Sequence, residues 1–165
     1  MLSESIFQKL KKFVILFFLS LYLTGCASIF LPTYLQDKNP YTRRFYANYD
    51  ESLQALNQTL KDLGWESEKA IDPLVYERQH ATDLDEQQTL ILTKTRQTPM
   101  FLGTRYARMN IYLRAKKGIS EIEIRYLTTT DLFFRGLKSY RNDSAVNRII
   151  THLEKLLHQK SEKAE

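Results

Sequence analysis

Two segments of the chain repeat apolar residues with the period of an α-helix. In residues 48–64 they recur every three or four positions, which places on one face Tyr49, Leu53, Leu56, Leu60 and Leu63. Asn48, followed three residues later by Glu51, is typical of a capping box, and Gly64 is typical of a helix end. Residues 144–158 show the same spacing at Val146, Ile149, Ile150, Leu153, Leu156 and Leu157. The pattern predicts two amphipathic helices, each with one buried face.

Between these helices the apolar period becomes that of a β-strand. Strands are predicted at residues 65–71, 74–80, 89–96, 105–116 and 119–130. Asp72 and Pro73 interrupt the first two, because both residues favour turns. The order of helix, strands and helix predicts an α+β fold. We expect an antiparallel sheet of four to five strands, with two helices packed on its apolar face in a helix-grip-like arrangement.

The last two strands form the clearest predicted pair. Lys117 and Gly118 lie between them, and glycine readily takes the positive φ that a tight hairpin requires. A two-residue loop gives the apolar pairs Leu113 with Ile122, Ile111 with Ile124, and Met109 with Tyr126. The other face then carries the pairs Arg114 with Glu121 and Tyr112 with Glu123. The hairpin is therefore expected to be apolar on one side and charged on the other.

The N-terminal region has the layout of a secretory leader. Lys9, Lys11 and Lys12 precede the uncharged run 13–23, which at eleven residues is shorter than the roughly 20 that span a bilayer. The run ends at Leu23-Thr24-Gly25-Cys26, which resembles the lipobox of bacterial lipoproteins. The alternative is an uncleaved transmembrane anchor, because residues 13–31 contain no charge.

The lipobox resemblance implies a specific processing and attachment. Residues 1–25 would be a signal peptide removed by cleavage, and the thiol of Cys26, the only cysteine, would carry a diacylglycerol. Ala27, which is not aspartate, implies sorting to the outer membrane with the protein facing the periplasm. Residues 26–47 would form a lipidated tether, 48–158 the α+β domain, and 159–165 a polar tail. The aromatic and basic residues of the tether suit either lipid headgroups or packing against the domain.

Composition and charge narrow the classes of function. The chain has 165 residues and a net charge of +5, which falls to about +3 without residues 1–25, too small an excess to indicate nucleic acid. A single cysteine excludes an intramolecular disulfide. His152 and His158 lie six positions apart, on different faces of the second predicted helix, and do not form a metal pair. We found no constellation typical of an active site, and expect no enzyme activity, no cofactor and no metal.

Two segments carry candidate residues for protein binding. On the sheet face opposite the helices, a row of tyrosine and arginine contains Tyr106, Arg108, Asn110, Tyr112 and Arg114. Such residues are enriched in interfaces, although an ordinary solvated face with cross-strand ion pairs gives the same pattern. The second candidate is the segment 133–141, which begins with Phe133 and Phe134.

The chain also resembles small envelope lipoproteins with a helix-grip domain of the BamC type. The matching features are the lipobox, Arg44-Phe45-Tyr46-Ala47, Ala55-Leu56, Leu60 and Leu63-Gly64-Trp65. Asp72-Pro73 departs from this pattern, in which a glycine usually lies between the first two strands, and only one such domain is present. The resemblance implies a non-enzymatic interaction or accessory component of an outer-membrane protein complex. The alternative is a lipoprotein that holds an apolar or glycan molecule between helix and sheet.

Overall fold

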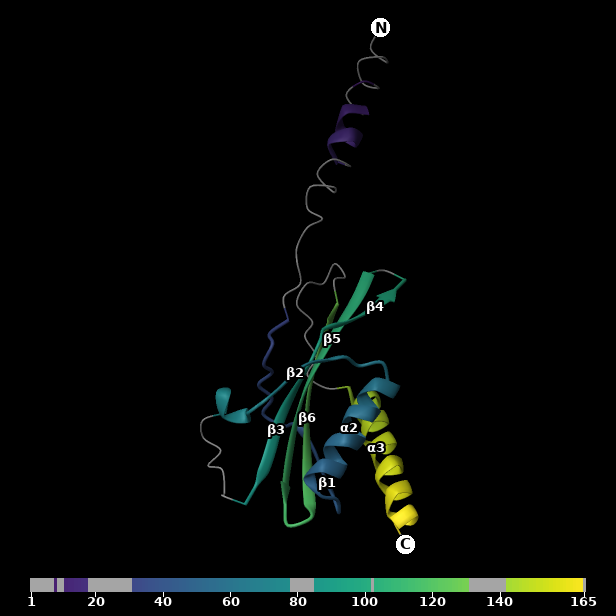
Figure 1. Ribbon diagram of the computed structural model, residues 1–165. Coiled ribbons are helices and arrows are strands. Elements are labelled where there is room, and N and C mark those ends of the chain that lie inside the picture. The colour runs from purple at the N-terminus through teal and green to yellow at the C-terminus, as the bar shows by residue number, and fades with distance from the viewer. Residues whose placement is uncertain are drawn as a thin grey trace. The chain divides into compact units, whose positions relative to one another are not determined.

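The computed structural model describes residues 8, 11–17, 31–77, 85–101, 103–130 and 142–164 (Figure 1). The chain divides into two compact units, Met1–Phe30 and Leu31–Glu165. Cys26, Phe133 and Phe134, which the sequence analysis singled out, lie outside the described residues. Within the described part of the chain, no helix combines the length and the apolar character needed to cross a membrane.

The second unit has the predicted α+β fold. Its sheet contains six antiparallel strands: β1 (Tyr41–Phe45), β2 (Ser67–Ile71), β3 (Gln87–Thr93), β4 (Arg96–Met100), β5 (Gly103–Lys116) and β6 (Ile119–Thr130). The strand order is β1-β6-β5-β3-β2, and β4 pairs with the first part of β5, whereas β3 pairs with the second part. The predicted four to five strands are therefore too few. The two that the sequence analysis missed as separate strands are β1 and β4, which are short and mostly exposed.

The hairpin between β5 and β6 has the predicted register. Ile111 lies opposite Ile124 and Leu113 opposite Ile122, as the two-residue turn requires. Lys117 and Gly118, in the turn, have φ values of 52° and 77°. These positive values suit a tight turn whose twist matches that of the strands.

Helices α2 (Tyr49–Asp62) and α3 (Asp143–Ala164) lie together on one face of the sheet (Figure 1). The capping box at α2 is confirmed, because the side chain of Asn48 accepts from the Glu51 amide at 2.9 Å and that of Glu51 accepts from the Asn48 amide at 3.1 Å. Helix α3 continues to Ala164, so it includes most of the predicted polar tail.

The strand predicted at residues 74–80 is wrong where the structure describes it. Pro73–Val75 form a short 3-10 helix, η1, and the Asp72 carboxylate accepts a hydrogen bond from the Leu74 amide at 2.9 Å. Proline fixes φ at a value suited to the first position of a helical turn, and aspartate caps such a turn. The local chemistry of these two residues therefore outweighs the apolar alternation that follows them.

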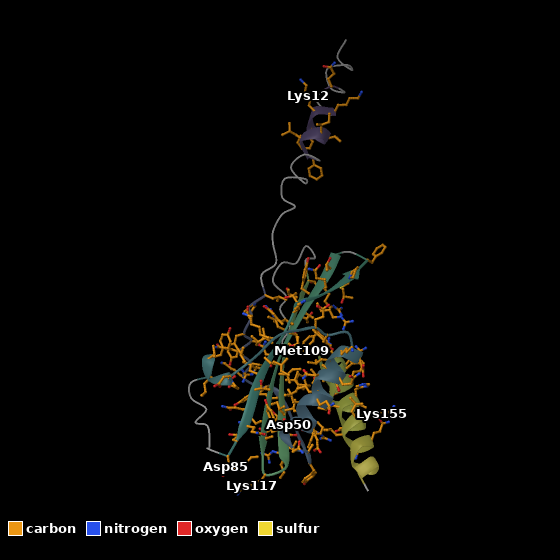
Figure 2. The ribbon with its side chains drawn as sticks, viewed as in Figure 1. Lys12, Asp50, Asp85, Met109, Lys117 and Lys155 are labelled. Carbon is orange, nitrogen blue, oxygen red and sulfur yellow. The ribbon has the colours of Figure 1, made fainter. Side chains whose placement is uncertain are left out.

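The core lies between the helices and the sheet. Leu56 and Leu60 of α2 and Val146 and Ile149 of α3 pack against the apolar face of β5 and β6. Met109 is fully buried near the middle of this layer (Figure 2). The face of the sheet away from the helices, which we call the outer face, is also covered, by residues that the sequence analysis assigned to the tether.

Candidate functional site

A short extended segment lies across the outer face of the sheet, and we call residues 31–37 the strap. Leu31 is 5% exposed and Leu35 is 1% exposed, and both pack with Leu127 of β6 and the half-buried Tyr106 of β5. The folded unit therefore begins at Leu31. This unit includes residues 31–47, which the sequence analysis assigned to the tether. Of the two environments considered for the tether, the strap has the second, because Leu31 and Leu35 pack against the sheet.

Asn110 of β5 holds the backbone of the strap. Its side-chain carbonyl accepts from the Leu35 amide at 2.5 Å, and its side-chain amide donates to the Thr33 carbonyl at 3.1 Å. The same amide group donates to the Met109 carbonyl at 3.1 Å. Asn110 is fully buried, so these hydrogen bonds satisfy a side chain that would otherwise be costly to bury.

Arg125 of β6 is the centre of a buried charge network beneath the strap. Its guanidinium pairs with Glu77 at 2.5 Å and with Glu123 at 2.5 Å. Nη1 of Arg125 also donates to Tyr34 Oη at 2.5 Å and to the Leu35 carbonyl at 3.4 Å. The side chains of Arg125, Glu77 and Glu123 are 10%, 9% and 11% exposed. The Arg125 guanidinium thus joins the sheet to the strap and to the segment after η1.

The network changes the acidity of its members. Burial alone would lower the pKa of Arg125, but hydrogen bonding to Glu77 and the charge of Glu123 outweigh it and raise the pKa. Burial, together with the hydrogen bond that Tyr34 donates to Glu77 at 2.5 Å, raises the pKa of Tyr34 to about 12. The Tyr34 ring stacks on Tyr76 with centroids 4.6 Å apart. Both groups keep their protonated forms at neutral pH, which preserves the contacts.

Arg108 makes a second connection between strap and sheet. Its Nε donates to the Thr93 carbonyl at 2.9 Å and its Nη1 donates to the Leu31 carbonyl at 3.4 Å. It also forms an ion pair with Glu68 of β2. Arg108 is 7% exposed, so its charge faces protein groups rather than solvent.

The predicted tyrosine and arginine row is therefore not an open surface. Tyr112 is 1% exposed, its hydroxyl donates to Gln88, and burial raises its pKa to about 12. Arg114 is half-buried, lies 5.1 Å from the centroid of the Tyr112 ring, and pairs with Glu121. All members of the row lie on the outer face, as predicted. However, Arg108, Asn110 and Tyr112 are not exposed to solvent, because the strap and the residues around η1 cover them.

Sequence reasoning missed the strap as the partner of this row. One signal was present: Asn110 and Arg108 alternate with Met109 and Ile111 in a strand that is otherwise suited to a core. An asparagine side chain in the centre of a sheet indicates that another segment covers it and supplies hydrogen-bond partners, because a buried amide requires such partners.

Two hollows lie at opposite ends of the unit. A shallow one of about 320 Å³ lies at the turn between β5 and β6, where Asp85 and Lys117 both contribute to its lining (Figure 2). The other, of about 240 Å³, lies where the helices meet β4 and β5, and its lining residues include Trp65, Tyr126, Arg96, Arg105 and Arg148. We call the latter the arginine cavity. No carboxylate is among the described residues that line it.

Aromatic contacts form the floor of the arginine cavity. The Arg96 guanidinium lies 5.4 Å from the centroid of the Trp65 ring and donates to the Leu63 carbonyl at 3.1 Å. Trp65 meets Tyr126 edge-on, with centroids 6.1 Å apart. Because Trp65 and Tyr126 are buried, the exposed residues of this cavity are the three arginines and Thr98.

Among the described residues, no group of three or more histidine, cysteine, aspartate or glutamate side chains is arranged to hold a metal ion. His152 instead contacts Asp62 of α2 at 3.0 Å. The chain matches no model of a known protein family and no curated protein sequence. The resemblance to BamC-type lipoproteins therefore stays a prediction, based on the motifs named in the sequence analysis.

Proposed function

We propose that this protein is a lipid-anchored, periplasm-facing lipoprotein of the outer membrane that acts without catalysis as an interaction or accessory component of an envelope protein complex. The observation that carries the proposal is the position of the strap. Leu31 is already buried in the folded unit, only five residues after Cys26. Five residues span about 17 Å at full extension, so a lipid on Cys26 would hold the folded unit close to the membrane surface.

The covered outer face supports a positioning role for the strap. The buried contacts of Asn110, Arg108 and Arg125 join the segment after Cys26 to the centre of the sheet. A flexible linker would leave the orientation of the folded unit free, whereas a segment held by buried hydrogen bonds restricts it. The anchor and the strap would then fix the orientation of the folded unit, so that the same end always faces its partners.

The described interior favours this reading over a binder of an apolar or glycan molecule. Leu56, Met109 and Ile111 are completely buried where α2 meets the sheet, so the centre of the helix–sheet layer is filled. Space lies at its edge, in the arginine cavity, whose charged groups are all cationic.

The test combines processing with partner capture in the native host. Replacing Cys26 with alanine should abolish incorporation of labelled palmitate, block cleavage before residue 26 and remove the protein from the outer-membrane fraction. Multiple acyl chains are needed for firm attachment, because each buried methylene contributes about 0.8 kcal/mol. Unchanged processing and fractionation of Cys26→Ala would show that the anchor proposal is wrong.

The second arm places a photocrosslinking residue at Tyr46. This side chain is 96% exposed between β1 and α2, and tyrosine is enriched in interfaces. Crosslinking in intact cells should capture an identified envelope protein from position 46, whereas the matched position Asn57, exposed on α2, should not. Capture from neither position, with the protein correctly anchored, would contradict an interaction role for this end.

A further inference from the structure

The hairpin formed by β4 and β5 ends in an exposed apolar residue. Phe101, between the end of β4 at Met100 and the start of β5 at Gly103, is 98% exposed. Single exposed apolar residues are common on protein surfaces, but an aromatic ring at the tip of a hairpin often contacts a membrane or another protein. The tip is supported by five paired positions, from Arg96–Ala107 to Met100–Gly103, which hold it as a defined hairpin.

The strands of this hairpin carry basic residues and no acidic ones. No aspartate or glutamate occurs from Gln87 to Ser120, a stretch that includes all of β3, β4 and β5. Arg96 of β4, Arg105 of β5 and Arg148 of α3 are exposed and line the arginine cavity behind the hairpin. Each guanidinium has five N–H donors, and planar donors of this kind bind phosphate well. The combination of an apolar tip and a cationic base is typical of proteins that enter the headgroup region of a bilayer.

The strap enters the folded unit at the side of the sheet nearer the β4–β5 hairpin tip. Leu31 contacts Arg108, and four residues later Leu35 contacts Asn110, so the chain runs away from the hairpin tip as it enters the fold. Leu31, the first residue of this unit, therefore lies nearer the hairpin tip than Leu35 does. Five strand positions separate Arg108 from Gly103 at the tip, about 17 Å, and the five residues from Cys26 to Leu31 also reach about 17 Å. The two lengths match well enough for one membrane plane to meet both.

We propose that the β4–β5 hairpin docks on an anionic lipid surface, with Phe101 at the boundary of headgroups and acyl chains and Arg96, Arg105 and Arg148 against headgroup phosphates. This inference rests on the proposed lipid anchor at Cys26. The covalent anchor makes the second contact intramolecular, so weak docking suffices to keep the hairpin on the bilayer. Lipid is the occupant favoured here, because the connection to Leu31 is too short to carry the hairpin far from the membrane.

The experiment uses the full protein isolated from bacterial membranes and reconstituted into vesicles. Phe101→Cys and, in a separate sample, Lys117→Cys carry a polarity-sensitive fluorophore, and a quencher is embedded in the bilayer. In phosphatidylcholine vesicles that contain phosphatidylglycerol, the label at position 101 should shift to the blue and be quenched. The label at position 117, at the other end of β5, should do neither.

Charge variants test the role of the arginines. Combining Arg96→Gln, Arg105→Gln and Arg148→Gln should lower the ratio of docked to undocked hairpin roughly 100-fold, since each basic residue at an anionic surface contributes about fivefold. A matched variant with Lys61→Gln, Lys69→Gln and Lys155→Gln removes three exposed charges elsewhere and should keep the quenching. Arg96 stacks on Trp65, so its replacement could disturb the fold. Phe101→Ser provides a second test, because removal of this exposed side chain does not endanger folding. In reconstituted vesicles this variant should lose the contacts between hairpin and lipid, measured by crosslinking from Thr98.

Each result separates this inference from the anchor proposal. Mass spectrometry of the same sample reports whether Cys26 carries lipid. A lipidated protein with an unquenched label at 101, or with equal quenching at 101 and 117, overturns hairpin docking and leaves the anchor intact. Quenching at 101 without lipid on Cys26 supports docking and contradicts the anchor. Binding of inorganic phosphate without quenching at 101 would make the arginine cavity a small-anion site and overturn the lipid assignment.

Discussion

At the scale of single residues, the outer face is stabilised by polar groups that are buried with their partners. Arg125 contacts two carboxylates, a phenol and a backbone carbonyl, and the side chains of Arg125 and of its two ionised neighbours are nearly covered. A buried ion pair contributes little net stability compared with apolar packing, but loss of one partner costs about 3–5 kcal/mol. Such a network therefore acts chiefly to select one position for the strap.

Tyr34 provides a prediction on pH dependence. Burial and the hydrogen bond to Glu77 raise its pKa from 10.0 to about 12 in the folded protein. A raised pKa means that folding favours the protonated phenol, so this contribution to stability is complete below pH 10 and is lost as the pH rises toward 12. The free energy of unfolding should therefore decline over this interval, and Tyr34→Phe should make the decline shallower while costing about 1–2 kcal/mol at neutral pH.

The measurement is urea unfolding at a series of alkaline pH values. Tyr46→Phe is the matched control, because it removes one phenol from a side chain that is 96% exposed. Its alkaline decline should follow that of the unmodified protein. An equally steep decline in Tyr34→Phe would show that the Tyr34 phenol is not coupled to folding.

At the scale of elements, local patterns predicted the parts of the fold that depend on neighbours in sequence. The capping box at Asn48 and the turn at Gly118 involve residues a few positions apart, and both are present. The apolar stripes of α2 and α3 likewise predicted which face is buried. These features could be predicted from the sequence because the interactions that cause them lie within one helical turn or one hairpin.

The strap could not be predicted in the same way. Leu35 and its partner Asn110 are 75 positions apart, and the contact of Tyr34 with Arg125 spans 91. Alternation in β5 placed Tyr112 on the outer face but contained no information about what lies above that face. The candidate row was therefore assigned to the correct side of the sheet and to the wrong environment.

The attachment of the strap gives a prediction at this scale. Asn110→Ala removes both hydrogen bonds to strap backbone and leaves the Leu35 amide and Thr33 carbonyl without these partners. Unsatisfied buried groups cost about 1–3 kcal/mol each, so the free energy of unfolding should fall by about 2–6 kcal/mol. Hydrogen exchange should increase most in residues 31–37, because a locally weakened segment opens before the rest of the unit.

The matched control is Asn57→Ala, at an exposed position of α2. It should change stability by no more than about 0.5 kcal/mol. If Asn110→Ala were as mild as this control, or if exchange rose uniformly across the sheet, the asparagine would not be the group that secures the strap.

At the scale of the whole molecule, a lipid on Cys26 would be linked through the strap to the sheet that contains the long β5–β6 hairpin. Strand β5 has 14 residues, which corresponds to about 43 Å from the tip at Gly103 to the turn at Lys116. If the anchor and the β4–β5 tip meet the same membrane plane, the β5–β6 turn stands tens of ångströms from the bilayer. The hollow at that turn, and the exposed Tyr46, would then be presented to partners at a fixed height.

Lengthening the connection tests whether its shortness sets this height. A Gly/Ser insertion of about 20 residues after Ala27 adds a flexible span with an r.m.s. length of about 25 Å. Lipid attachment should persist, but the folded unit should tilt, so energy transfer from a label at Lys117→Cys to dyes in the bilayer should rise above the low value of the unmodified spacing. An insertion within the loop at Asp85, which lengthens the chain equally without touching the connection, should leave the transfer low. Identical transfer with and without the inserted spacer would mean that the five residues between Cys26 and Leu31 do not control the orientation, and that any constraint on the unit comes from its partners instead.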